Sequence, residues 1–120
     1  MSTMTLEEIL DVIVLMDAHL DSAASPDYQA QPLAQDWARV TKPCEEAGEA
    51  WQAFSRLTGE NPRKGKCGTL DEVLGELGDT AASALMAVQH LVKDRQRVLE
   101  VLSAAMEKAR ARALAGGIAP

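Results

Sequence analysis

Two short segments of this 120-residue chain carry carboxylates at spacings that suit a metal ion. Glu45–Glu49 reads Glu-Glu-Ala-Gly-Glu, an EExxE pattern, and Glu76–Asp79 reads Glu-Leu-Gly-Asp, an ExxD pattern. Residues three or four apart lie on one side of a helix, so each segment would present its carboxylates together. Oxygen ligands without histidine or cysteine favour Mg²⁺, with Mn²⁺ as a possible substitute, over zinc.

A solvent-facing acidic stripe is the alternative interpretation of either segment alone. Like charges at these spacings repel, and an exposed helix usually places Lys or Arg among them. Neither stripe contains such a cation among its carboxylates. If the two helices pack as antiparallel neighbours, their carboxylates converge and require a cation between them. We therefore predict a divalent metal site between the two acidic segments.

A basic loop lies between the two acidic segments. Arg63, Lys64 and Lys66 follow Asn61-Pro62 and precede a helix start, an arrangement that suits phosphate oxygens. A solubilising loop is the alternative. Lys42 stands one turn before Glu46, where it can reach the same site or pair with that glutamate.

Three aromatic residues flank these charges. Trp37 is a candidate for stacking on a nucleotide base, although a tryptophan at helical spacing more often packs in a core. Trp51 and Phe54 fall opposite the carboxylates at ~100° per residue, so we expect them to pack in the core. On the following helix the pattern repeats, and the apolar stripe comprises Leu70, Val73, Leu74, Leu77, Ala81, Leu85 and Val88.

Four helices and no strands are predicted. Thr5 and Thr69 each begin a T-x-x-E capping box, which starts helices over about residues 5–21 and 69–92. A second helix ends before Gly59, and Asp94 caps a fourth that Gly116-Gly117 ends. Pro43 either begins a new helix or lies within one long helix, and the sequence leaves both open. The prediction is one all-α domain over residues 1–120, an antiparallel four-helix bundle.

Composition agrees with a folded helical protein. The chain is 47% hydrophobic and 25% charged, aromatic residues make up 3%, and the net charge is −6. That negative charge argues against nucleic-acid binding through the whole surface. Residues 1–62 carry 11 acidic and 3 basic side chains, whereas residues 63–120 carry 7 and 9. An acidic N-terminus and the lack of a long apolar run predict a cytoplasmic protein without a signal peptide or membrane partner.

Taken together, the motifs resemble those of the MazG-like family of all-α nucleoside triphosphate pyrophosphohydrolases. The resemblance covers about Trp37 to Leu91 and includes both acidic patterns in their order. The segments Trp37–Lys42, Asn61–Gly65 and Ala87–His90 also resemble a MazG-like subgroup. Pro43 and Gly78 depart from the family pattern at positions that affect helix geometry more than chemistry.

The resemblance implies a MazG-like bundle that hydrolyses a nucleoside triphosphate to the monophosphate and pyrophosphate in nucleotide-pool housekeeping. It implies Mg²⁺ ligands at Glu46, Glu49, Glu76 and Asp79, with Glu45 and Glu46 in catalytic positions. Phosphate contacts are expected from Lys42, Arg63, Lys64 and Lys66, and a base contact from Trp37. The family forms homodimers or homotetramers. Two alternatives stay open: a catalytically inactive helical nucleotide-binding or interaction module, and a phosphoribosyl-ATP pyrophosphohydrolase.

Overall fold

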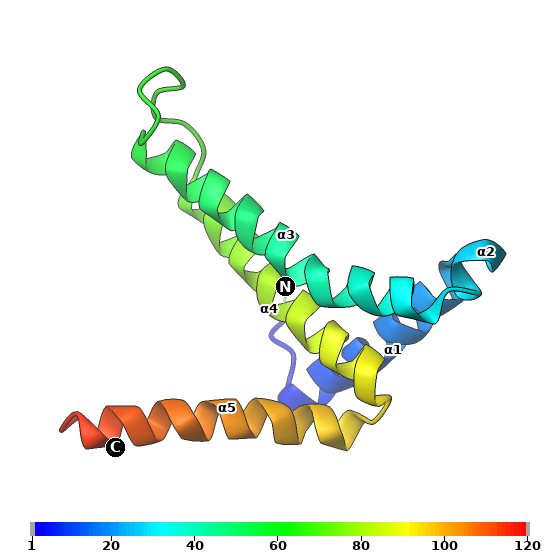
Figure 1. The fold of residues 1–120 in the computed structure, drawn as a ribbon. Helices are drawn as coiled ribbons and strands as arrows, with labels where there is room; N and C mark the ends of the chain where they lie inside the picture. The colour runs from blue at the N-terminus through cyan, green and yellow to red at the C-terminus, as the bar shows by residue number, and fades with distance from the viewer. Residues whose placement is uncertain (1, 120) are drawn as a thin grey trace.

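A computed structural model describes residues 2–119, which form five helices and no strand (Figure 1). The predicted all-α class is therefore confirmed. The helices are α1 (Leu6–Ala23), α2 (Pro26–Gln29), α3 (Pro32–Thr58), α4 (Leu70–Val92) and α5 (Arg95–Ala115). The long helices α3 and α4 lie side by side as an antiparallel hairpin, whose tip is the basic loop. Helix α1 crosses the other end of that hairpin, and α5 leaves it as a separate arm (Figure 1).

The predicted helix starts have their physical basis in side-chain caps. The Thr5 hydroxyl accepts the Glu8 backbone N–H at 3.2 Å, and the Glu8 carboxylate accepts the Thr5 N–H at 2.8 Å, which completes the capping box. At α4 only half of the predicted box forms, because the Thr69 hydroxyl accepts the Glu72 N–H without a return bond among the described residues. The Asp94 carboxylate caps α5 as predicted.

The structure settles the alternatives at Pro43 in favour of one helix. Helix α3 runs continuously from Pro32 to Thr58 with Pro43 inside it. A proline in a helix interior removes one backbone hydrogen bond and crowds the preceding turn. Figure 1 shows the bend that this predicts between the two halves of α3. The predicted connector before α3 contains one unpredicted turn, α2, which Ser25 caps and Pro26 begins.

The hairpin packs through small and polar side chains. Ala50 and Ala53 of α3 are buried, as are Val73, Ser83 and Ala87 of α4. These residues share their helix faces with Glu46 and Glu76 at spacings of three or four residues. The packed faces therefore include the carboxylates, and small residues let the two helices approach each other closely.

The large apolar residues of the hairpin face outward, which contradicts the prediction that Trp51 and Phe54 pack in the core. Trp51 is 64% exposed and Phe54 53%, and Leu70, Leu74 and Leu77 are exposed as well. The physical reason is that the alanine face of α3 contacts α4, while none of the helices in residues 2–119 covers the neighbouring faces. Leu10, Ile13 and Val98 form the small core where α1, α4 and α5 meet.

The chain is less compact than its length allows. Its Cα radius of gyration is 17.6 Å, whereas a compact domain of this size has about 13.6 Å. The open shape leaves apolar surface on the hairpin and on α5 without a covering element. None of the described helices combines the length and hydrophobicity that a membrane span requires.

Candidate metal centre

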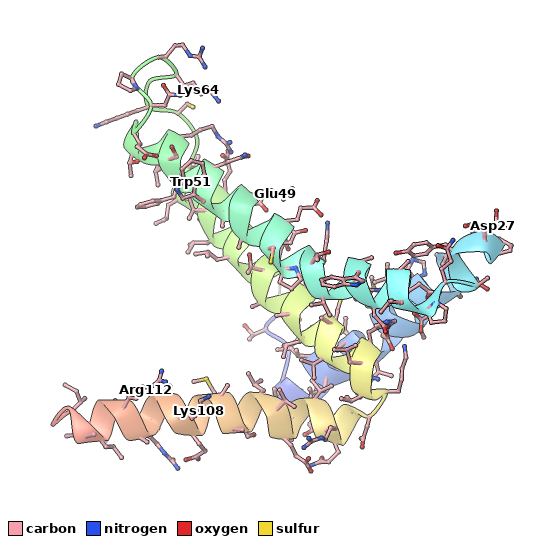
Figure 2. The ribbon with its side chains drawn as sticks, viewed as in Figure 1. Asp27, Glu49, Trp51, Lys64, Lys108 and Arg112 are labelled. Atoms are coloured by element: carbon pink, nitrogen blue, oxygen red, sulfur yellow. The ribbon has the colours of Figure 1, made fainter. Side chains whose placement is uncertain are left out.

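Three of the four predicted metal ligands meet where α3 packs against α4. Glu46, Glu49 and Glu76 each offer a carboxylate oxygen, and these oxygens all lie within 4.8 Å of one another. Glu46 and Glu76 belong to the packed faces and are partly buried, whereas Glu49 is exposed at the mouth of the cluster. Figure 2 marks Glu49 part-way along α3. The two acidic patterns therefore face each other in space, as their spacing predicted.

Electrostatic repulsion within the cluster is evident at Glu49. The negative charge of Glu46, followed by hydrogen bonding to Glu76, raises the pKa of the Glu49 carboxyl above its ordinary value. A raised pKa means that three charged carboxylates at this point are unfavourable without a cation. The cluster therefore concentrates negative charge at one point of the hairpin.

Glu76 provides the clearest fit to a metal ion. Its Oε2 atom is shielded from solvent and has no hydrogen-bond partner among the described residues. A buried carboxylate oxygen without a donor is costly unless a cation or water satisfies it. With oxygen as the sole donor type, the cluster suits Mg²⁺ or Mn²⁺, which take carboxylates together with water or phosphate oxygens.

The remaining acidic motif residues lie outside this group of oxygens. Glu45 is exposed on α3, and its carboxylate lies 3.2 Å from the Lys42 ammonium. Lys42 also lies 3.1 Å from Glu46, and these bonds, the one to Glu46 first, raise the pKa of the lysine. Asp79 is exposed one turn beyond Glu76 and is not among the clustered oxygens. Lys42 thus partly compensates the acidic stripe, which the sequence reasoning treated as uncompensated.

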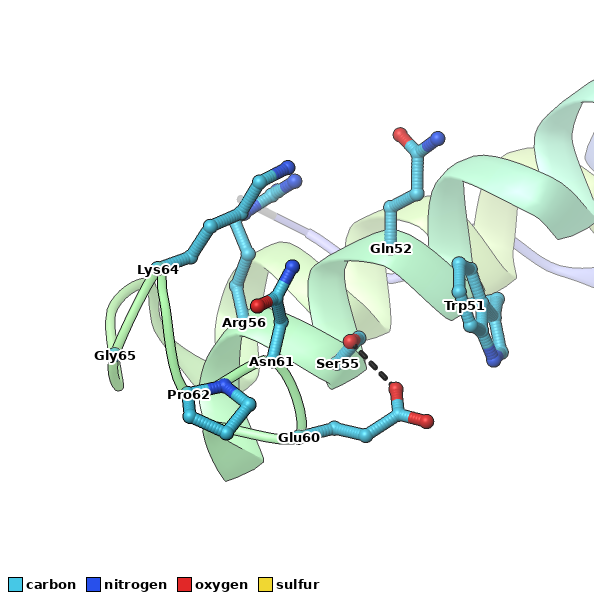
Figure 3. A pocket seen from close by; sticks show the side chains of 9 residues that line it. All are labelled: Trp51, Gln52, Ser55, Arg56, Glu60, Asn61, Pro62, Lys64 and Gly65. Atoms are coloured by element: carbon cyan, nitrogen blue, oxygen red, sulfur yellow. Dashed lines mark hydrogen bonds between the residues drawn. The ribbon is translucent and has the colours of Figure 1, made fainter.

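The basic loop encloses a hollow at the tip of the hairpin. The hollow measures about 520 Å³, and Lys64 from the loop and Arg56 from α3 both line it (Figure 3). The other lining residues are Trp51, Gln52, Ser55, Glu60, Asn61, Pro62 and Gly65. Among the described residues, neither Lys64 nor Arg56 forms an ion pair, and the same holds for Arg63 and Lys66. An unpaired cluster of cations in a protein of negative net charge is a favourable place for an anion.

Two local contacts shape this loop. Gly59 ends α3 with φ of 73°, a left-handed conformation that glycine adopts at little cost. The Lys66 side chain lies against Gly59, where an added Cβ would come within 2.6 Å of the lysine Cγ. A backbone bond from the Cys67 N–H to the Arg56 carbonyl, 2.9 Å long, ties the loop back to α3.

Trp37 lies apart from this hollow, on the first half of α3. It is exposed and lines a small apolar depression of about 200 Å³ with Leu33, Asp36 and Val40. The core interpretation of Trp37 is therefore wrong for the single chain. Trp51, which was assigned to the core, instead lines the tip hollow.

Sequence reasoning missed Arg56 and Gln52 as candidate binding residues. Both continue the helical stripe of Glu45 and Glu49 toward the loop, at spacings of three and four residues. Helical periodicity alone could therefore have identified both residues.

Sequence reasoning also missed a second acidic group, which consists of Asp17, Asp21 and His90. No local motif joins these residues, since the fold brings them together from α1 and the end of α4.

Comparisons with protein families, with curated proteins and with solved structures give no match to this chain.

Proposed function

We propose that this chain is a Mg²⁺-dependent nucleoside triphosphate pyrophosphohydrolase of the MazG-like type. The observation that carries the proposal is the convergence of Glu46, Glu49 and Glu76 from two helices, with a shielded and unpartnered oxygen on Glu76. The order of the EExxE and ExxD patterns and the basic loop between them support the same assignment.

In this proposal the three clustered carboxylates hold Mg²⁺, and Asp79 completes the ligand set from one turn further along α4. The bound ion would neutralise phosphate charge and lower the pKa of a bound water. Glu46 would also take part in catalysis, and its partly buried carboxylate is held by the Lys42 ammonium 3.1 Å away. Exposed Glu45 would be a further ligand or help to orient the attacking water.

The phosphate chain would extend from the acidic cluster toward the tip hollow. Glu49 and Arg56 are separated by seven residues, or ~10 Å at 1.5 Å per residue along the helix. A triphosphate can span such a distance. Lys64, Arg63 and Lys66 then contact the phosphate oxygens, and Lys42 does so from the opposite side of the cluster. Trp37 remains the proposed base contact only if a neighbouring copy brings it close to the site.

Assembly into a homodimer or homotetramer is part of the proposal. The outward leucines of α4 and the exposed Trp51 and Phe54 form an apolar surface on one hairpin. Surfaces of that kind on a soluble chain mark sites of association. A second copy would complete the four-helix bundle that the sequence predicted. Light scattering coupled to gel filtration should give a mass of two or four chains.

The decisive experiment measures pyrophosphate release from the eight common nucleoside triphosphates, their damaged forms and phosphoribosyl-ATP, with and without Mg²⁺. We expect Mg²⁺-dependent release from at least one of them. Glu49→Gln should abolish that release while circular dichroism stays unchanged. Asp71→Asn, which alters an exposed carboxylate of the same hairpin outside the cluster, is the matched control and should retain activity.

The outcomes also separate the alternatives. Release confined to phosphoribosyl-ATP would assign the chain to that narrower activity. Nucleotide binding without pyrophosphate release from any substrate would assign it to the inactive binding module. Full activity in both Glu49→Gln and Glu76→Gln would contradict the metal-site argument itself.

A further inference from the structure

A second cluster of charged side chains lies away from the candidate catalytic centre. Asp17 and Asp21 stand one turn apart on α1, and His90 lies in the last turn of α4. Their ligand atoms all lie within 4.8 Å of one another. The side chains of Asp17 and His90 are only 5% and 8% exposed. The cluster therefore joins α1 to the hairpin, with Asp17 and His90 buried and Asp21 partly exposed at 37%.

The two nitrogen atoms of His90 have different surroundings. Nε2 lies 2.6 Å from the Oδ1 atom of Asp36, a contact in which the ring N–H donates to the carboxylate. In the neutral ring this leaves Nδ1 with a lone pair. Nδ1 is shielded from solvent and has no hydrogen-bond partner among the described residues. It lies 3.6 Å from Oδ1 of Asp17 and 3.6 Å from Oδ1 of Asp21.

This geometry is that of a metal ligand held by a carboxylate. A histidine that binds a metal through one nitrogen almost always donates its other N–H to a carboxylate, carbonyl or water. Asp36 occupies that position toward His90. A lone pair aimed at two carboxylate oxygens is repulsive unless a proton or a metal cation lies between them. The separations also fit, because bonds of about 2.1 Å in a tetrahedral site place neighbouring donor atoms about 3.4 Å apart.

We propose that Asp17, Asp21 and His90 bind a divalent metal of the zinc class, with Asp36 orienting the histidine. The presence of an imidazole nitrogen distinguishes this site from the all-oxygen cluster on α3 and α4, which suits Mg²⁺. The bound metal would fasten α1 to the end of the hairpin, a stabilising role that does not depend on the proposed hydrolase activity.

Two cationic side chains already contact the same carboxylates, and they would affect metal binding differently. The Lys93 ammonium lies 2.7 and 2.6 Å from the Oδ2 atoms of Asp17 and Asp21, so coordination through Oδ1 leaves these bonds intact. Arg39 lies 3.0 Å from each Oδ1 atom and competes directly with a metal. Removal of the Arg39 charge should therefore strengthen metal binding, although it removes two ion pairs.

The test is calorimetric titration of metal-stripped, full-length protein with ZnCl₂, paired with the visible spectrum of the Co²⁺ form. Both exposed thiols, Cys44 and Cys67, are changed to serine throughout because they could bind zinc themselves. Glu49→Gln is added so that the other acidic cluster is impaired. We expect one Zn²⁺ per chain, a tetrahedral Co²⁺ spectrum, and no competition from Mg²⁺.

Three substitutions then assign the ligands. His90→Gln should weaken zinc binding at least about a hundredfold and abolish the Co²⁺ spectrum, while Asp36→Asn should weaken it about 10- to 100-fold. Arg39→Gln should tighten binding about tenfold, and zinc should restore the melting temperature that this variant loses. If His90→Gln does not fold, Asp21→Asn replaces it, because Asp21 is more exposed.

The opposite results would overturn the proposal. Zinc affinity that is unchanged in His90→Gln or Asp21→Asn would place the metal elsewhere. An Arg39→Gln variant that binds zinc more weakly and melts lower at every zinc concentration would show that the cluster is a network of ion pairs alone.

Discussion

The two acidic clusters of this protein differ in how their charge is balanced. At Glu46, Glu49 and Glu76 one lysine, Lys42, pairs with a single member, and the mouth of the site is exposed. At Asp17 and Asp21 two cations and a histidine surround two carboxylates, and Asp17 is buried. The first arrangement leaves oxygen atoms available to a ligand, whereas the second directs most of its oxygen atoms to the protein itself.

The pKa shifts express this difference. Repulsion raises the pKa of Glu49, as expected where carboxylates lack cations. Burial alone would raise the pKa of Asp21 too, but Lys93 and Arg39 hold it below its ordinary value. Like-charged side chains therefore gather for opposite physical reasons in the two places. In the first cluster the carboxylates repel one another, and in the second ion pairs join α1 to the hairpin.

The largest expected effect concerns the proposed metal ligands Glu76 and Asp79, which should differ in their importance for activity. Glu76→Gln should lower kcat about a thousandfold, because it removes a shielded oxygen that has no other partner. Asp79→Asn should lower kcat less, about 10- to 100-fold, because Asp79 is exposed outside the group of oxygens. Steady-state pyrophosphate release at saturating Mg²⁺ measures both. A larger loss in Asp79→Asn would reverse this ranking.

The second effect is a loss of folding stability when a carboxylate of the Asp17–Asp21 cluster is neutralised. Asp17→Asn should lower the free energy of unfolding by roughly 2–3 kcal/mol, because Arg39 and Lys93 lose the charge of a buried partner. The figure is at the low end for a buried pair because Lys93 is about half exposed. Urea denaturation followed by circular dichroism measures it. Glu100→Gln, which removes a surface ion pair with Arg97, should change stability by less than about 1 kcal/mol.

The contrast between the clusters also explains how far the sequence could predict them. Glu46, Glu49 and Glu76 lie in two local motifs on two helices that are joined by one loop. Helical periodicity was therefore enough to predict that they lie close together. Asp17 and Asp21 meet His90 only because α1 crosses the end of the hairpin. Contacts between such distant segments have no local signal in a single sequence.

For the fold, the sequence predicted where helices begin but not which helix faces are covered. Caps at Thr5, Thr69 and Asp94 located three helix starts because each depends on a hydrogen bond within three residues. The burial of Trp51 and Phe54 was predicted wrongly because periodicity identifies an apolar face but does not say what covers it. In this chain alanines form the helix contact, and the aromatic rings lie outside it.

A third effect tests the tip hollow as part of the catalytic site. Arg56→Gln should raise KM for the substrate about tenfold with little change in kcat, because Arg56 contributes a charge at the hollow rather than at the metal cluster. Arg112→Gln, which removes an exposed cation from the end of α5, is the matched control and should leave KM unchanged. Equal KM values in the two variants would separate the hollow from substrate binding.

The smallest effect is the pH dependence of the metal-free protein. Because the folded-state pKa of Glu49 is raised, the folded protein binds its proton more tightly than the unfolded chain does. Stability from this residue is therefore present below its ordinary pKa of 4.5 and is lost as pH rises from there through the raised value.

The experiment measures melting temperatures in EDTA across this pH range. The melting temperature of the wild type should fall relative to that of Glu49→Gln as pH rises. Glu45→Gln, outside the cluster, should follow the wild type. Saturating Mg²⁺ should remove the difference above that range, since the ion replaces the proton between the carboxylates. If the decline persists unchanged in Glu49→Gln, it arises outside the acidic cluster, and repulsion at Glu49 is not its cause.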